Sequence, residues 1–139
     1  MSGYLVYMKK ESGRQYEEML HQQFYGQIDG RLRAVFFELD DWIHREFGKR
    51  LIITCLNRTK EENKVVGGVE WSAHLFGRAI DGRTHIFTRE EITKITNHLT
   101  DVWGDFIYAK YHNAGTGNHL HINITYKYIR KNFGQLKLR

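Results

Sequence analysis

Two short segments of the sequence, residues 72–81 and 118–124, hold most of the side chains that could carry out chemistry. In an extended strand, successive side chains point to opposite faces. The second segment would then carry a polar face, His119, His121 and Asn123, and an apolar face, Leu120, Ile122 and Ile124. We expect the apolar face to lie on a core and the imidazoles to point into a groove.

The first segment adds an imidazole, His74, and a carboxylate, Asp81. Two neutral imidazoles and one carboxylate give a zinc ion three ligands and leave a fourth position for water, as in catalytic zinc sites. Water on zinc ionises near neutral pH, and the metal also polarises a carbonyl. Such a set would support hydrolysis of an amide bond. Either segment alone is weak evidence for a metal, and the combination is what indicates one.

The spacing within the first segment resembles a known motif. Ser72, His74, Gly77, Ala79 and Asp81 fit S-x-H-x-x-G-x-A-x-D, in order and spacing. This motif is typical of the D-Ala-D-Ala carboxypeptidase and L-Ala-D-Glu endopeptidase family, and it is also present in hedgehog signalling domains. The later His-Leu-His of residues 119–121 looks like the second half of the same signature. The resemblance covers residues 51–124.

The resemblance implies a role for each matching residue. It makes Zn²⁺ the cofactor and assigns three ligands, His74, Asp81 and His121. It places His119 in the active site as a neighbour of the metal, and Ser72 would support the ligands by hydrogen bonding. Arg58 looks like the family arginine over the substrate carbonyl, where a fixed cation stabilises an oxyanion.

One part of the family pattern is missing. Family peptidases usually carry a Glu or Asp a few residues before the last histidine ligand, as general base, but no acidic residue follows Asp105. The candidates for the base are His112, His119 and Glu70, and His112 ranks first because imidazole titrates in a suitable range. The other interpretation is a site that binds metal without efficient hydrolysis.

Apolar periodicity predicts the elements that position these segments. The apolar spacing predicts helices at residues 16–24 and 32–43, and Gly48 is expected to end the second one. A third helix is expected to begin at a capping box of Thr88 and Glu91 and to end before residue 103. Strands are expected at three segments, 51–56, 105–111 and 119–126, and residues 69–81 are expected to be a strand or extended chain. A charged turn is expected at 60–64 and a loop at 112–118.

These elements predict the α+β class, in which an antiparallel sheet carries helices on one side and the zinc site on the other. We interpret residues 1–139 as a single domain, with residues 1–29 as an extension of unclear role. Cys55, in the apolar run 51–56, reads as a buried structural thiol.

The amino-acid composition limits the classes of partner that we expect for this protein. The formal net charge of +5 would suit a polyanion, but Lys and Arg are scattered, so nucleic acid is not the favoured partner. No apolar run approaches membrane-spanning length, and no signal peptide is evident. We therefore expect synthesis in the cytoplasm and action at the cell wall, as a phage lysin or a virion component among virion proteins.

Two functions remain open from the sequence. The first is a zinc-dependent peptidase, a carboxypeptidase or endopeptidase, that hydrolyses the stem or cross-link peptides of peptidoglycan with metal-activated water. The second is a non-catalytic zinc-binding structural or interaction module of a virion or another assembly. The missing carboxylate favours the second, whereas Arg58 favours the first, because a structural site needs no oxyanion clamp.

Overall fold

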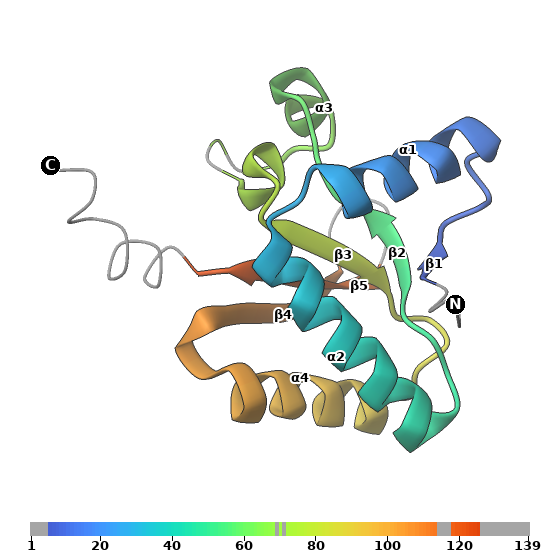
Figure 1. Ribbon diagram of the computed structural model, residues 1–139, viewed down its shortest axis with the longest axis vertical. Helices are drawn as coiled ribbons and strands as arrows, with labels where there is room; N and C mark the ends of the chain where they lie inside the picture. The colour runs from blue at the N-terminus through green and yellow to red at the C-terminus, as the bar shows by residue number, and fades with distance from the viewer. Residues whose placement is uncertain (1–5, 69, 71, 114–117, 126–139) are drawn as a thin grey trace, which may run out of the picture.

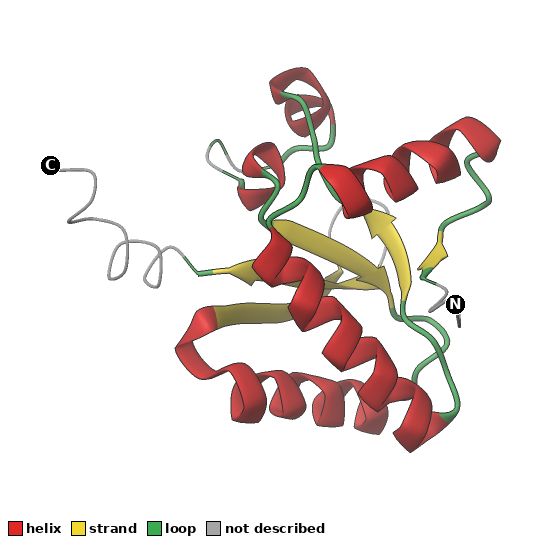
Figure 2. Ribbon diagram, in the orientation of Figure 1, coloured by secondary structure: helices red, strands yellow, loops and turns green. Residues whose placement is uncertain are grey.

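The computed structural model describes residues 6–68, 70, 72–113 and 118–125. A five-stranded sheet lies at its centre, with the strand order β1-β2-β3-β5-β4 (Figure 1 and Figure 2). In chain order the elements are β1 (Tyr7–Met8), α1 (Arg14–Gly26), α2 (Gly30–Phe47), β2 (Ile52–Cys55), α3 (Lys60–Val65), the 3-10 helix η1 (Ala73–Phe76), β3 (Ala79–Arg83), α4 (Arg89–Trp103), the 3-10 helix η2 (Gly104–Phe106), β4 (Ile107–Asn113) and β5 (Asn118–Ile124).

The sheet is antiparallel except at one edge. β2 pairs with β3, β3 with β5, and β5 with β4, all antiparallel, so the predicted α+β class and the predicted antiparallel arrangement of these strands are confirmed. The edge strand β1 departs from the prediction because it runs parallel to β2. The chain passes through α1 and α2 between these two strands, and a crossover of that length permits parallel pairing.

One face of the sheet is covered by helices, with α2 and α4 side by side against it (Figure 1). Both helices were predicted from their apolar faces, and both bury those faces, through Leu32, Val35, Phe36, Leu39 and Ile43 in α2 and Ile92, Ile95 and Leu99 in α4. The capping box of Thr88 and Glu91 is present. A carboxylate of α2, on Glu38, accepts hydrogen bonds from His98 and Trp103 of α4 and ties the two helices together.

The N-terminal segment is part of this core. α1 buries Leu20 and Phe24 completely, and the ring of Phe24 packs edge-on against Phe36 of α2. The Tyr16 hydroxyl donates a hydrogen bond of 2.6 Å to the carbonyl oxygen of Thr54 in β2. Residues 14–26 thus fix one end of β2, the strand that leads to Arg58. None of the described helices is both long enough and apolar enough to span a bilayer.

Two local predictions are wrong. The charged turn expected at 60–64 is the helix α3, because Thr59 and Glu62 form a capping box that starts it. Residues 69–81 were expected to be extended, but 73–76 form η1 before β3 begins at Ala79. β4 and β5 also extend further into the predicted 112–118 loop than expected, to Asn113 and from Asn118; residues 114–117 lie outside the described residues.

Candidate zinc centre and its pocket

The five motif residues of the first segment each shape the turn from η1 into β3. The Ser72 side chain caps η1 by accepting a hydrogen bond of 3.2 Å from the backbone N–H of His74. Gly77 ends η1 with a φ of 68°, in the left-handed region that favours glycine. A Cβ at Gly77 would also lie 3.2 Å from the carbonyl oxygen of Gln27. Fully buried Ala79 then begins β3, which brings Asp81 opposite His121.

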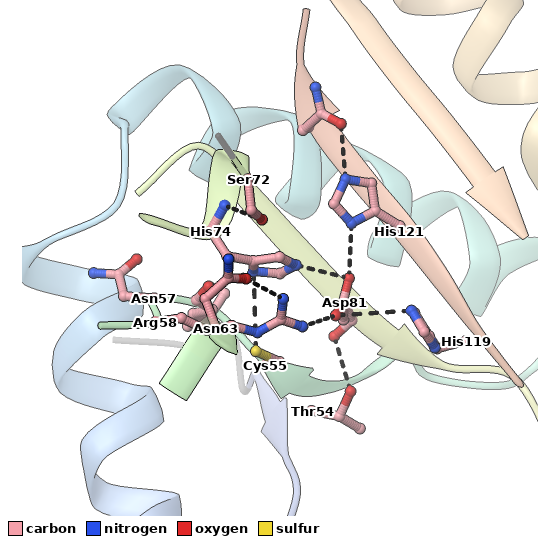
Figure 3. A network of polar contacts seen from close by, with 12 residues as sticks. Thr54, Cys55, Asn57, Arg58, Asn63, Ser72, His74, Asp81, His119 and His121 are labelled. Carbon is pink, nitrogen blue, oxygen red and sulfur yellow. Dashed lines mark hydrogen bonds and ion pairs between the residues drawn. The ribbon is translucent and has the colours of Figure 1, made fainter. Parts of the chain in front are cut away.

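Asp81 is the centre toward which the candidate residues converge (Figure 3). Asp81 as a residue is only 4% exposed. Oδ1 lies 3.1 Å from Nε2 of His74 and 3.0 Å from Nδ1 of His121. Oδ2 lies 3.4 Å from Nη2 of Arg58 and 3.8 Å from Nε2 of His119. The structure thus brings together both predicted histidine ligands, the predicted arginine and the predicted neighbour.

Hydrogen bonds on the far side of each imidazole determine which nitrogen holds the lone pair. His74 donates from Nδ1 to the carbonyl oxygen of Leu56, which can only accept. His121 Nε2 lies 2.8 Å from Oδ1 of Asn123, and the Asn123 amide group is oriented by donating to the carbonyl of Ile124. In the neutral tautomers, Nε2 of His74 and Nδ1 of His121 are therefore free to act as ligands, and both face Asp81.

This donor set fits zinc. Nε2 of His74 is buried, and among the described residues it makes no hydrogen bond of proper geometry despite its 3.1 Å approach to Asp81. Two ligand atoms that share a tetrahedral zinc ion, each about 2.0–2.1 Å from it, lie about 3.3 Å apart. The separations of 3.0 and 3.1 Å around Oδ1 are close to that spacing, so Asp81 is placed to share an ion with either imidazole.

The surroundings of Asp81 favour positive charge beside its carboxylate. Burial alone would raise the pKa of Asp81, but the close contacts and charges of His121 and His74 outweigh it and lower the pKa well below the ordinary value. Burial alone would lower the pKa of His74, but Asp81 and Cys55 raise it to about 9. A proton thus compensates the buried carboxylate where a metal ion would otherwise do so.

Arg58 is held beside the carboxylate by its own network. Its backbone N–H donates to the carbonyl of His74 at 3.0 Å, and Nη1 donates to Oδ1 of Asn63 at 3.3 Å. Asn63 is buried, and Gly68 packs so closely that a Cβ there would lie 2.0 Å from that Oδ1. Sequence reasoning found Arg58 but missed Asn63, whose only signal was its place between Arg58 and the Gly67-Gly68 pair.

A comparison with known families decides what this centre belongs to. The sequence model of the family described as Peptidase M15 matches residues 15–122, well over half of the chain. The chain belongs to the peptidase M15 family. This confirms the resemblance to D-Ala-D-Ala carboxypeptidases that the motif predicted, and it makes the protein a metallopeptidase of a family that is in general zinc-dependent. No curated protein and no solved structure gives a significant match.

The candidate bases of this M15 peptidase differ in their position. His112 lies in β4, directly opposite His119 in β5, with ring centroids 4.2 Å apart, and both line the pocket around Asp81. Burial lowers the pKa of His112, and so do the neighbouring imidazoles of His119 and His121, which favours a neutral ring able to accept a proton. Glu70 is exposed and is not among the residues that line the pocket.

Cys55 was wrongly predicted to be a buried structural thiol. It is partly exposed, and Sγ lies 3.9 Å from Nδ1 of His74. The register of β2 against β3 shifts between Ile53 and Cys55, so regular alternation no longer turns Cys55 toward the core. Among the described residues, Cys55, His74 and Asp81 are close enough together to hold a metal ion.

The choice between Cys55 and His121 as the third ligand follows from the tautomer of His74. Cys55 faces Nδ1, which uses its proton on Leu56 and has no lone pair to offer. His121 instead reaches the same Asp81 oxygen that Nε2 of His74 approaches. The geometry therefore favours His121, and it places Cys55 behind the first imidazole.

The centre opens into a pocket of about 1010 Å³. Besides the residues above, its lining includes Asn118, the end of α3 with the turn after it at residues 65–68, and a group that sequence reasoning missed, Lys9, Tyr16, Thr54, Arg83 and His85. Burial raises the pKa of Tyr16 to about 12, so its phenol stays protonated and structural. These residues come from elements that are far apart in the sequence and are brought together by the fold, which no local pattern reveals.

Proposed function

We propose that the protein hydrolyses peptide bonds in the stem or cross-link peptides of peptidoglycan, with a zinc ion held by His74, Asp81 and His121. The observation that carries the proposal is the convergence of Nε2 of His74 and Nδ1 of His121 on one oxygen of Asp81. When bound there, zinc supplies Lewis acidity that activates water and polarises a peptide carbonyl.

The side chains around the centre have complementary parts in the reaction. Arg58 points at the Asp81 carboxylate from the side opposite β5, where its guanidinium stabilises the oxyanion that forms as water adds to the peptide carbonyl. His112, neutral through its lowered pKa, accepts the proton of the attacking water and passes it to the leaving amine as the C–N bond breaks. His119 packs against the His112 ring and holds its orientation.

The substrate is proposed from the family resemblance and the shape of the site. An open pocket of about 1010 Å³ admits several residues of a peptide, and the motif is shared with enzymes that act on D-Ala-D-Ala and L-Ala-D-Glu bonds. Action at the cell wall, as a phage lysin or as a virion component, is part of the same proposal.

The test is release of fragments from purified muropeptides by the zinc-loaded protein, measured by chromatography with mass detection and repeated after chelation. His121→Ala should lose both zinc and hydrolysis. His85→Ala is the matched control, because His85 is exposed, lines the pocket and, among the described residues, forms no hydrogen bond or ion pair with Asp81. Zinc bound at full stoichiometry without any hydrolysis would instead favour a non-catalytic zinc-binding module of a virion or another assembly.

A further inference from the structure

The pocket is strongly unbalanced in charge. Three basic side chains with permanent charge line it, Lys9, Arg58 and Arg83, together with several histidines. Asp81 is the one acidic side chain among its described lining residues, and that carboxylate already faces Arg58 and the histidines. A pocket with this lining attracts an anion, and a bound Zn²⁺ would add to the attraction.

Lys9 supplies a basic group from the edge of the sheet, two strands away from Asp81. Its backbone N–H donates to the carbonyl of Ile53 at 2.8 Å, which continues the pairing of β1 with β2. The preceding Met8 is buried in the core, so Lys9 projects from the opposite face, which is the face that carries Asp81. Its ammonium lies 5.8 Å from the centre of the Tyr16 ring, which is itself anchored to Thr54.

The two distal cations differ in their partners. Arg83 is paired through both terminal nitrogens with Glu11, at 2.8 and 2.7 Å. For Lys9, within the part of the chain that the structure describes, the side-chain contact is the Tyr16 ring; Glu11 lies near enough to feel the lysine charge, but its ion pair is with Arg83. Lys9 is therefore the cationic side chain at this end of the pocket that is available to donate hydrogen bonds to a carboxylate of a ligand.

The distance between Lys9 and the proposed metal site limits which carboxylate of a bound peptide can reach Lys9. β1 is separated from β3 by β2, and adjacent strands lie about 4.8 Å apart, so Lys9 starts about 10 Å from the strand of Asp81. An extended peptide spans about 3.3–3.6 Å per residue. A carboxylate at Lys9 would thus belong to a residue about three positions from the bond at the metal, and not to the residue that is cut.

We propose that Lys9 is a specificity-determining residue that binds a carboxylate of the peptide substrate about three residues from the scissile bond. The proposal rests on the proposed function for the nature of the ligand. It concerns a residue that precedes the part of the chain matched by the family model, residues 15–122. It also gives the N-terminal strand a part in binding as well as in folding.

The experiment measures equilibrium binding of three synthetic stem peptides to the full-length protein. The peptides are L-Ala-γ-D-Glu-L-Lys-D-Ala-D-Ala, the same peptide with its glutamate α-carboxylate amidated, and the same peptide with its C-terminus amidated. Metal is removed by chelation so that no peptide is cut, and circular dichroism verifies the fold. Lys9→Gln is compared with Lys10→Gln, a neighbouring lysine that is exposed and is not among the pocket lining.

We expect one of the two amidations to weaken binding to the wild-type protein about tenfold, as loss of a charge-assisted hydrogen bond does. Lys9→Gln should weaken binding of the parent peptide equally and be insensitive to that amidation, while Lys10→Gln should behave as wild type. Equal binding of all three peptides by the wild type, discrimination that survives in Lys9→Gln, or no binding of any peptide would each overturn the proposal. Hydrolysis is assayed separately with zinc, so binding without turnover would contradict the proposed function and still support the role of Lys9.

Discussion

Asn63 accepts a hydrogen bond from Arg58, with 3.3 Å between Oδ1 and Nη1, and so holds the guanidinium beside Asp81. Asn63 is buried beneath Gly68 in the short helix α3. The position of the proposed oxyanion clamp therefore depends on a residue five positions further along the chain and on a glycine beyond it.

Replacing Arg58 tests the clamp directly. We expect Arg58→Gln to lower kcat by about a hundredfold, the cost typical of losing one oxyanion donor, while zinc stays bound. Steady-state kinetics and metal analysis on the same preparation are the measurement. Arg78→Gln is the control, because Arg78 is a nearby arginine that lies over the Phe76 ring and does not line the pocket. A similar loss in both variants would contradict the assigned role.

Gly68→Ala tests the support beneath the clamp. The new methyl group would lie 2.0 Å from Oδ1 of Asn63, so the Asn63 side chain has to move and its hydrogen bond with Arg58 is expected to be lost. We expect a loss of about 1–3 kcal/mol in the free energy of unfolding, as for other overpacked sites, together with a lower kcat. Gly26→Ala is the matched control, since its Cβ would meet nothing within 4 Å. Denaturant titration gives the first quantity, and wild-type stability in Gly68→Ala would refute the packing argument.

Zinc should stabilise the fold through its ligands. A ligand at about a hundred times its Kd stabilises the native state by about 2.7 kcal/mol, so zinc should raise the Tm of the chelated protein. The rise should disappear in His121→Ala and persist in Cys55→Ser, because Cys55 faces the protonated nitrogen of His74. Calorimetric scans with and without zinc measure it. A shift lost in Cys55→Ser and kept in His121→Ala would reverse the choice of third ligand.

His112→Ala tests the proton carrier. Well-placed acid–base groups contribute about a hundredfold to ten-thousandfold in rate, so we expect hydrolysis to fall by about tenfold or more with zinc retained. Lys110→Ala is the control, because Lys110 lies on the same face of β4, opposite His121, and is exposed. Unchanged turnover in His112→Ala would exclude this residue as the base.

Asp29 gives a pH-dependent contribution to stability outside the site. It caps α2, and a hydrogen bond from Arg31 is the main reason that its pKa lies below the ordinary value of 3.8. A lowered folded-state pKa means that the ionised cap stabilises the fold above the unfolded-state pKa and loses this effect as pH falls through the folded-state pKa. We expect Asp29→Ala to cost about 1 kcal/mol near neutral pH.

Measuring the stability of wild type and Asp29→Ala again at low pH tests this prediction. The difference between wild type and Asp29→Ala in urea unfolding should shrink as pH drops below 3.8. Asp41→Ala, which removes an exposed pair with Arg45 on the same helix, should cost only about 0.3–0.5 kcal/mol. A difference for Asp29 that stays constant through that pH range would show that its charge does not contribute.

Local patterns in the sequence were sufficient for α1, α2, α4 and β5. The alternation of residues 118–124 places His121 and Asn123 on the face opposite the core, as predicted. Residues 72–77 could not be read in this way, because a cap at Ser72 and a left-handed Gly77 produce a 3-10 turn whose period matches neither a strand nor an α-helix. Cys55 was misread because a register shift in β2, invisible in a run of apolar residues, changes its direction.

Two hydrogen bonds join the end of β2 to the first histidine: Nδ1 of His74 donates to Leu56, and the N–H of Arg58 donates to the carbonyl of His74. Residues 56–58 and 74 therefore form one small rigid unit in which ligand and arginine share a frame. Transplanting the metal motif of residues 72–81 into another scaffold would carry the ligands without the strand end that orients them. A working graft would have to move residues 55–58 as well.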